Sequence, residues 1–522
     1  MSQPHGRAGA AAVVLVMLVS MTVWHPYPYD NVVTRWALTT RLVDAGTLSI
    51  DPWAFMTADK ALWAGRYYCD KAVMSSIAAS VVYAPMSLLG LRSPPPGQLP
   101  VGGAARFLVE RITVGGFFLL LLLFLRRRLQ EEGYDPLIPL LALGAGSILL
   151  PYSTMLYAHV QAASLIFLSW YSQDRGKYLL ADICGAAAVS FEFPVLVLWV
   201  IILCYRGRGY WRSATAARAA GILVLFMLPQ MVCNRIAFGS PFTMGYSLEV
   251  EESFSGIREG LFGFTVPSIG TFYMIALSPE RGLFFYMPWA VPALAGLWGR
   301  GGIRKALGEG PGIPLVVAWL LLFSAQYARA SGWAFGPRYL IPVIPFLAWG
   351  LARFASRSPR HAFTSLVLLL PSMLMCLLGT FGEPHQPVHP FERPLPLPQL
   401  SIGLRMLLDG HHSVWLLGAA GTLAVSLGLI AIWAARFRGT RPCLPAAAVL
   451  VPWLALGILS SRADWGGKID YYRGLLAQHR HEYDLAASYY LSALEDPTAP
   501  AAVRENYDYC HEMADTPGER AD

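Results

Sequence analysis

Long apolar stretches separated by short polar segments run through most of the chain and end near residue 461. Apolar runs of about 20 residues predict helices that cross a membrane. The sequence after Ser461 is instead charged and rich in Tyr. We therefore expect an all-α polytopic membrane domain over 1–461 and a small helical domain over 462–522. The apolar stretches lie at 8–24, 72–91, 105–125, 137–152, 157–172, 178–190, 194–205, 219–235, 283–299, 312–328, 339–352, 362–380, 413–435 and 444–461.

Composition supports the membrane class. Of 522 residues, 55% are hydrophobic and only 14% are charged, whereas a soluble protein carries about 25% charged residues. The net charge of +7 comes from Arg-rich loops, which orient membrane proteins, so we expect no nucleic-acid partner. The first apolar stretch lacks a small-residue cleavage site and is typical of a signal anchor.

Five basic clusters determine the predicted topology, because Lys and Arg collect on the cytoplasmic side of a membrane protein. If 72–91 is a juxtamembrane or re-entrant segment on the outer side, all five clusters fall in the cytoplasm. This arrangement has thirteen spanning helices, a cytoplasmic N-terminus and an outer C-terminal tail. It also splits 178–205 into two short helices that turn at Glu192. The basic clusters are 126–128, 206–218, 300–305, 353–361 and 436–441.

Polar residues of chemical interest collect in the predicted outer loops, mainly in 25–104 and 236–281. The stretch from His25 to Lys71 packs five Asp and five Lys or Arg residues beside a bilayer. Charge in that setting is costly and is usually functional. The loop 236–281 is too long for a simple connector, so we expect a lid or an acceptor-binding loop, with a plain solvated loop as the alternative.

Asp30 follows the first helix closely and has two compatible interpretations. Asp30 and Asn31 are expected to cap a short interfacial helix that carries Arg35. A carboxylate at this place is also suited to act as a general base on an acceptor hydroxyl. Lys71 begins the next apolar segment, where its ammonium group reaches the depth of lipid phosphates, although ordinary snorkelling would place it there too.

The combination of these residues resembles a known family. Asp30 just after the first helix is followed about forty residues later by Tyr67, Tyr68, Asp70 and Lys71 before an apolar segment. This pattern resembles the bacterial GT-C glycosyltransferases, which are related to protein O-mannosyltransferases and lipid A aminoarabinose transferases. Similar motifs recur at 151–159, 191–194, 238–241, 278–283 and 336–340.

The resemblance implies an inverting enzyme of about thirteen helices at the outer face of a bacterial inner membrane. It would move a sugar from a polyprenyl-phosphate donor to a glycan, lipid or protein acceptor. The chain departs from the family in having one carboxylate at Asp30-Asn31 and Val73-Met74 after Asp70-Lys71-Ala72. With a single carboxylate, neither a metal nor another cofactor is expected.

The resemblance also implies residue roles. Asp30 would be the base, and Lys71, Arg338 and Arg281 would hold the donor phosphate. A planar guanidinium suits phosphate oxygens, but interface anchoring of Arg338 and loop capping by Arg281 remain alternatives. The expected substrate contacts are Glu192, His159, Tyr68 and Asp70.

Each of these contacts has a structural alternative. A single His is more often a hydrogen-bonded structural residue than a ligand. Glu192 lies between two Phe residues, where a carboxylate is costly unless it is paired or hydrated, so an ion pair with Arg338 or Lys71 is the alternative to binding sugar hydroxyls. The remaining acids of the first outer loop are expected to form caps and turns, and they are Asp44, Asp51 and Asp59.

The C-terminal residues 470–515 match one tetratricopeptide-like helical hairpin, with a plain amphipathic hairpin as the alternative. It is expected to pack on the membrane domain, dimerise or dock a protein partner. Cys69 and Cys510 would both lie outside, so a disulfide between them stays open.

Two other functions remain open. A lipid-linked glycan transporter or flippase would show internal repeats and mid-membrane charges, and neither is visible here. A non-catalytic membrane assembly subunit would use its tail for docking.

Overall fold

The computed structural model describes residues 4–381 and 468–515 apart from short gaps. The last two predicted spans and the Pro-rich stretch before them lie outside the described residues. The gaps are 24, 26–27, 29, 97–100, 207–212, 251–255, 258, 262, 279–280, 299–309, 327–333, 480–481, 496–498 and 500.

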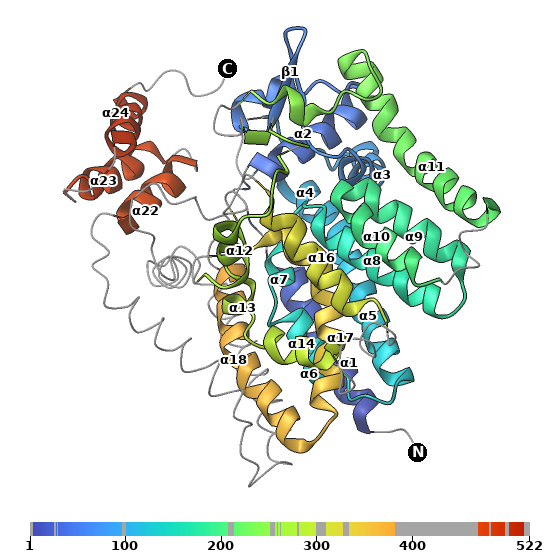
Figure 1. Ribbon diagram of the computed structural model, residues 1–522. Coiled ribbons are helices and arrows are strands. Elements are labelled where there is room, and N and C mark those ends of the chain that lie inside the picture. The colour runs from blue at the N-terminus through green and yellow to red at the C-terminus, as the bar shows by residue number, and fades with distance from the viewer. Residues whose placement is uncertain are drawn as a thin grey trace.

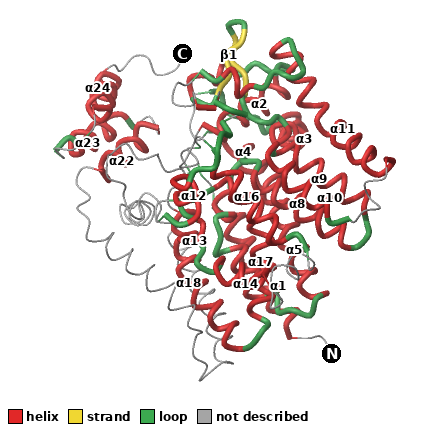
Figure 2. The backbone as a smooth tube through the Cα atoms, viewed as in Figure 1, coloured by secondary structure: helices red, strands yellow, loops and turns green. Residues whose placement is uncertain are grey.

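The described chain is mostly helical, as predicted from the apolar stretches (Figure 2). The helices of its first half are α1 Pro4–Thr22, α2 Asp30–Asp44, α3 Met74–Leu88, α4 Gly103–Glu110, α5 Gly116–Glu131, α6 Leu137–Gly144, α7 Leu149–Tyr152, α8 His159–Asp174, α9 Tyr178–Phe191, α10 Leu196–Cys204 and α11 Ser213–Phe238. They are followed by α12 Ile269–Ala276, α13 Leu283–Tyr286, α14 Ala290–Trp298, α16 Gly312–Ser324, α17 Ile344–Ala355 and α18 Pro359–Phe381.

Within the part of the chain that the structure describes, three helices are long and apolar enough to cross a membrane, judged by length and composition. They are Gly103–Glu131, Ala214–Phe238 and Pro359–Leu377. Several other predicted spans are shorter or interrupted. The stretch 137–152 is divided between α6 and α7, and 283–299 between α13 and α14. The total of thirteen spans therefore stays a prediction.

The predicted break at Glu192 is confirmed. Helix α9 ends at Phe191, Glu192 has an extended backbone with φ −144° and ψ 102°, and the short helix η3 Phe193–Val195 leads into α10. Pro194 favours this break, because a proline fits the first turn of a new helix but cannot continue the old one.

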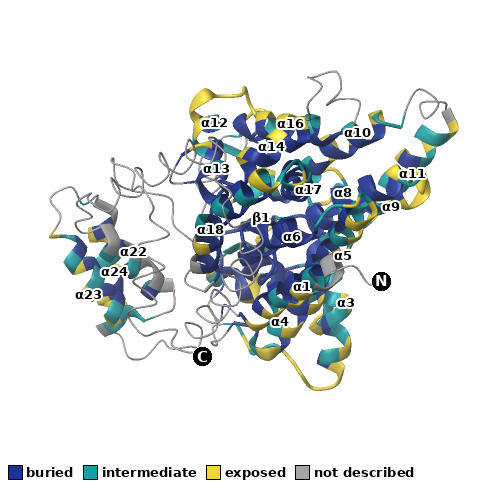
Figure 3. Ribbon diagram, turned by 90° about the horizontal axis from the view of Figure 1, so that it is seen from below, coloured by how far each residue is buried: buried dark blue, intermediate teal, exposed yellow. Residues whose placement is uncertain are grey.

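The helices pack into a buried core that fills the middle of the main body (Figure 3). Helices α14 and α17 approach so closely that a Cβ at Gly296 would lie 1.8 Å from the carbonyl oxygen of Gly350. Small residues at such crossings let helix backbones touch, which is the usual way that membrane helices gain packing contact.

A β-hairpin projects at the end of the main body opposite the N-terminus (Figure 1). Its strands β1 Lys60–Trp63 and β2 Arg66–Cys69 pair antiparallel, with Lys60 opposite Cys69. The turn residues Ala64 and Gly65 both have positive φ, at 50° and 76°, which matches the right-handed twist of a tight hairpin. The sequence did not predict these strands.

Helices α2 and α3 pack together near this hairpin. The Tyr83 and Ser87 hydroxyls donate hydrogen bonds of 2.8 and 2.7 Å to the carboxylate of Asp44, the last residue of α2. The Asp51 carboxylate accepts the N–H of Tyr67 at 2.6 Å. Asp44 thus joins α2 to α3, and Asp51 binds the backbone of β2, so both acids make structural contacts with other elements rather than the predicted caps and turns.

The two predicted outer loops are joined by backbone contacts. The Val250 N–H donates to the Lys60 carbonyl at 3.3 Å, and the Lys60 N–H donates to Oε1 of Glu249 at 3.2 Å. Gly245 lies directly on the backbone of Asp70, where an added Cβ would be 2.7 Å from the Asp70 Cα. Segment 245–250 therefore covers the base of the hairpin.

The C-terminal residues form three helices with a core of their own, α22 Lys468–His479, α23 Tyr483–Ala493 and α24 Ala501–Asp515. Tyr490 of α23 is fully buried against Gly474 of α22, where a Cβ would lie 2.5 Å from the ring. Cys510 is buried in this core, and Cys69 is buried near the hairpin, and both are free thiols. The disulfide that the sequence left open is therefore not formed.

Candidate functional site

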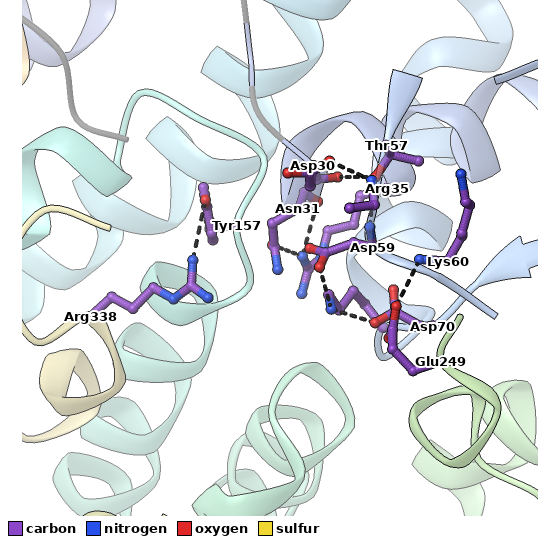
Figure 4. Close-up of polar contacts among 12 residues, drawn as sticks. Asp30, Asn31, Arg35, Thr57, Asp59, Lys60, Asp70, Tyr157, Glu249 and Arg338 are labelled. Atoms are coloured by element: carbon purple, nitrogen blue, oxygen red, sulfur yellow. Dashed lines mark hydrogen bonds and ion pairs between the residues drawn. The ribbon is translucent and has the colours of Figure 1, made fainter. Parts of the chain in front are cut away.

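Charged side chains from segments far apart in sequence meet at the base of the hairpin (Figure 4). We call this group the outer charge cluster. Segment 245–250 supplies one member, and the first outer loop supplies the others. Its members are Asp30, Asp59, Asp70, Lys71 and Glu249.

Asp30 begins helix α2 and is held in place by residues that precede the hairpin. Its Oδ1 accepts the N–H of Ala58 at 2.5 Å, and its carbonyl accepts the Thr57 hydroxyl at 3.1 Å. Burial, and then the negative charge of Asp59, raises the pKa of Asp30 from 3.8 to about 6, while Lys71 acts in the opposite direction. A carboxylate with such a pKa exists in both protonation states near neutral pH, which suits a general base.

Asp59 makes the main correction to the sequence-based site. Its predicted role was a cap or turn, but its buried Oδ1 lies 3.1 Å from the Lys71 Nζ. The hairpin explains this contact. Lys60 pairs with Cys69, so Asp59 and Asp70 follow as neighbours at the open end of the two strands. Recognising the hairpin around Ala64-Gly65 would have revealed this pairing.

Lys71 lies between two carboxylates, because its ammonium group also contacts the carboxylate of Asp70. Burial lowers the pKa of Lys71, but the charges of Asp59 and Asp70 outweigh it and raise the pKa well above its ordinary value. The Lys71 ammonium is therefore charged, and it lies 5.2 Å from the centre of the Tyr246 ring. A phosphate at this place would share Lys71 with Asp59 and Asp70.

Glu249 is buried beside Asp70. Burial, and then the charge of Asp70, raises the pKa of Glu249 to about 10, against the opposing effect of Lys71. Glu249 is thus a neutral acid at neutral pH, and it joins the covering segment to the hairpin without adding charge.

Arg35 is a second cation that the sequence placed only on an interfacial helix. It is buried, and its Nη1 donates to the carbonyl of Asn31 at 3.2 Å and to the Asn31 side chain. Its charge acts on both Tyr157 and Tyr246. Arg35 therefore lies between the outer charge cluster and the next group of residues. The spacing of four between Asn31 and Arg35 was the available signal, since such pairs share a helix face.

Arg338 and two tyrosines form that next group. The Arg338 guanidinium donates to the hydroxyls of Tyr157 and Tyr339, each at 3.4 Å, and lies 5.5 and 5.2 Å from their ring centres. The charges of Arg338 and Arg281 both act on the hydroxyl of Tyr152. Two of the three predicted phosphate ligands, Arg338 and Arg281, therefore lie near the same tyrosine.

His159 and Glu192 form a pair, with 2.7 Å between Nδ1 and Oε1. The predicted partner of Glu192 was Arg338 or Lys71, and the structure gives His159 instead. His159 begins α8, so the α9–η3 break places Glu192 against a helix start. The ring of His159 stacks on Tyr157 at 5.7 Å, and the charge of Glu192 acts on Tyr246. The pair therefore adjoins both groups described above.

Tyr68 is not brought into the charged site. Its ring packs edge-on against Phe238 at 5.4 Å, within a small apolar cluster that also contains Ala61. Among the described residues, no group of three or more His, Cys, Asp and Glu side chains is placed to hold a metal ion. In the outer charge cluster, the carboxylates of Asp59 and Asp70 contact the ammonium group of Lys71.

No protein-family description matches the sequence, and no curated protein matches it. The residues of the site are therefore the guide to an activity, because a helical fold alone does not define one.

Proposed function

We propose that this chain is an integral-membrane glycosyltransferase of the GT-C type. It would transfer a sugar from a polyprenyl-phosphate donor to an acceptor hydroxyl at the outer face of a bacterial inner membrane. The observation that carries the proposal is a carboxylate with a pKa of about 6 close to the ammonium of Lys71, which is 10% exposed, and to the buried guanidinium of Arg35. A base and an anion-binding set are the two groups that this reaction requires.

In the proposed reaction, Asp30 takes the proton from the acceptor hydroxyl. The acceptor oxygen attacks the anomeric carbon from the face opposite the phosphate. The bond between that carbon and the phosphate oxygen breaks, and polyprenyl phosphate leaves as the anion. A single displacement inverts the anomeric centre, and it needs only one carboxylate, which Asp30 supplies.

Cations on either side of Asp30 would hold the leaving phosphate. Arg35 and Arg338 are the stronger candidates, because guanidinium groups bind phosphate oxygens in pairs. Lys71 would contribute after partial release from Asp59, which now lies 3.1 Å from it. Arg281 would act from the side of Tyr152.

The His159–Glu192 pair and the Tyr157 hydroxyl are suited to hydrogen bonds with sugar hydroxyls. The proposed topology is the one predicted from the sequence, with thirteen spans and a cytoplasmic N-terminus. Residues 470–515 would lie outside and dock a protein partner. The proposed reaction uses neither a metal nor another cofactor.

The test is transfer of labelled sugar from a panel of polyprenyl-phosphate hexoses and pentoses in vesicles that contain the purified protein. Asp30→Asn should lower transfer by about 10²- to 10⁴-fold, the usual contribution of a general base. It should still bind undecaprenyl phosphate, the sugar-free product. Asp51→Asn is the matched control, because Asp51 is an acid of the same loop that only accepts the Tyr67 N–H.

Equal transfer by Asp30→Asn and the native protein would rule out the assigned base. Movement of the donor across the vesicle membrane without any transfer would favour a flippase. Binding of a protein partner by the tail, with no transfer by any form, would favour an assembly subunit.

A further inference from the structure

A buried group of three charges lies where α4 continues into the short π-helix η2 Arg111–Gly115. Arg106 and Glu110 form an ion pair of 2.8 Å with both side chains fully buried, and Arg111 is also buried. Two arginines against one glutamate leave this triad with a formal charge of +1. Charges at such depth are costly, so their contacts call for an explanation.

The triad binds two separate backbone segments. Arg106 Nη2 donates to the carbonyl of His25 at 2.5 Å, and Arg111 Nη2 donates to the carbonyl of Val23. These carbonyls lie just beyond the end of α1, where a helix leaves carbonyls without partners. His25 stands five residues before Asp30 in the sequence.

The second segment is the turn before α8. Arg111 Nη2 also donates to the carbonyl of Thr154 at 3.2 Å, and Oε1 of Glu110 accepts the N–H of Leu156 at 3.3 Å. Leu156 precedes Tyr157, whose hydroxyl accepts a hydrogen bond from Arg338. One triad therefore holds the segment that carries the proposed base and the segment that carries the proposed donor contacts.

We infer that Arg106, Glu110 and Arg111 are positioning residues that set the placement of Asp30 relative to Tyr157 and Arg338. The catalytic role of this alignment rests on the proposed function. The alignment of the two segments by the triad does not. Two segments that must be aligned to within about 0.5 Å for chemistry are tied to a single rigid helix turn.

A purely structural ion pair in the same protein is different. Arg206 forms an ion pair of 2.6 Å with the Asp182 carboxylate. In the triad, Arg106 also pairs with Glu110, but the Nη2 atoms of Arg106 and Arg111 donate to backbone carbonyls of two other chain segments. Loss of such a donor should release those segments locally rather than weaken the whole fold.

The test uses Arg111→Lys, which keeps the charge but is shorter, so its ammonium cannot take the position of Nη2, the atom that donates to both Val23 and Thr154. Amide hydrogen exchange in the segments around 23–31 and 153–160 should accelerate by about tenfold or more in both. The matched control is Arg206→Lys, a buried arginine distant from this site in sequence, which should leave both segments unchanged.

The second readout is infrared titration of the Asp30 carboxyl, identified by the band that Asp30→Asn removes. In the native protein its midpoint should lie at about 6. Arg111→Lys should move the midpoint toward 3.8, because a loosened segment admits water and relieves burial. A merely structural role would not move this titration.

The inference is overturned if only one segment, or neither, exchanges faster, if exchange rises throughout the protein, or if the Asp30 midpoint stays in place. Neither readout depends on catalysis. If the native protein neither transfers sugar nor binds undecaprenyl phosphate, the proposed function fails while the alignment of the two segments is still decided by exchange.

Discussion

Two buried charge clusters of this protein differ in their balance of acids and cations. In the first, the Asp182 carboxylate lies between two arginines, with Arg206 at 2.6 Å from one oxygen and Arg218 at 2.8 Å from the other. In the outer charge cluster, Asp30, Asp59 and Asp70 gather near the single cation Lys71.

The difference indicates what each cluster is for. The Asp182 cluster places an arginine beside each carboxylate oxygen and ties α9 to the segment after α10 and to α11. An excess of buried acid instead raises pKa values and leaves the cluster responsive to a proton or an anion. The same type of substitution should therefore have opposite effects in the two places.

The largest effect is expected for Asp182→Asn. It leaves the fully buried Arg206 without its counter-charge, which should lower the free energy of unfolding by about 3–5 kcal/mol. Chemical denaturation in detergent micelles measures this quantity. Asp174→Asn is the control, because Asp174 is exposed and its pair with Arg128 contributes only about 0–1 kcal/mol. A loss as small as that of the control would contradict the contrast.

Asp30→Asn should change stability in the opposite direction. The pKa of Asp30 is about 6 in the folded protein and 3.8 when unperturbed, so the folded state binds the proton more tightly. Ionisation of Asp30 therefore costs folding free energy as the pH rises through this range, up to about 3 kcal/mol above pH 6.

The amide keeps the acceptor for Ala58 and cannot ionise. Asp30→Asn should thus raise the free energy of unfolding by about 1–3 kcal/mol at pH 8. The gain should vanish near pH 4, where the native carboxyl is protonated. Denaturation curves at pH 4 and pH 8 measure this difference in the free energy of unfolding. An equal gain at both pH values would show that ionisation of Asp30 does not destabilise the folded protein.

Lys71→Gln should weaken binding of undecaprenyl phosphate by about tenfold, the value of one charge-assisted hydrogen bond. Lys60→Gln is the matched control, because the Lys60 ammonium donates to the carbonyl of Ala54 and not to the cluster. Thermophoresis in detergent measures both affinities. Equal affinity of Lys71→Gln and the native protein would remove Lys71 from the phosphate site.

The smallest effect is expected for Asp59→Asn, with a gain in affinity for the same ligand. The substitution removes the carboxylate that competes with phosphate for Lys71, and affinity should rise about threefold. It also removes the charge that raises the pKa of Asp30, so the acidic limit of transfer should move to lower pH. Weaker binding would show that Asp59 positions Lys71 rather than competing for it.

Patterns local in sequence were predicted well. The start of a helix at Asp30 and the break at Glu192 both depend on residues within one or two turns. Lys71 was selected from its immediate neighbours and lies in the outer charge cluster, and its contact with phosphate stays a prediction. Partners that depend on tertiary contacts were missed, and they include His159 for Glu192 and the hairpin that brings Asp59 to Lys71.

The triad was missed for another reason. Arg106, Glu110 and Arg111 lie at the edge of an apolar stretch, and averaging over a long window hides three charges among many apolar residues. The spacing of four between Arg106 and Glu110 predicts a pair on one helix face. It gives no information about the carbonyls that this pair binds in distant segments.

Gly245 has a consequence for how the protein can vary. Its side chain is a single hydrogen atom, and nothing larger fits between it and the backbone of Asp70. Among homologues that share this site, position 245 should therefore tolerate less change than many charged positions around it. A search for distant relatives would be better guided by the joint presence of Gly245, Asp59 and Lys71 than by acidic motifs alone.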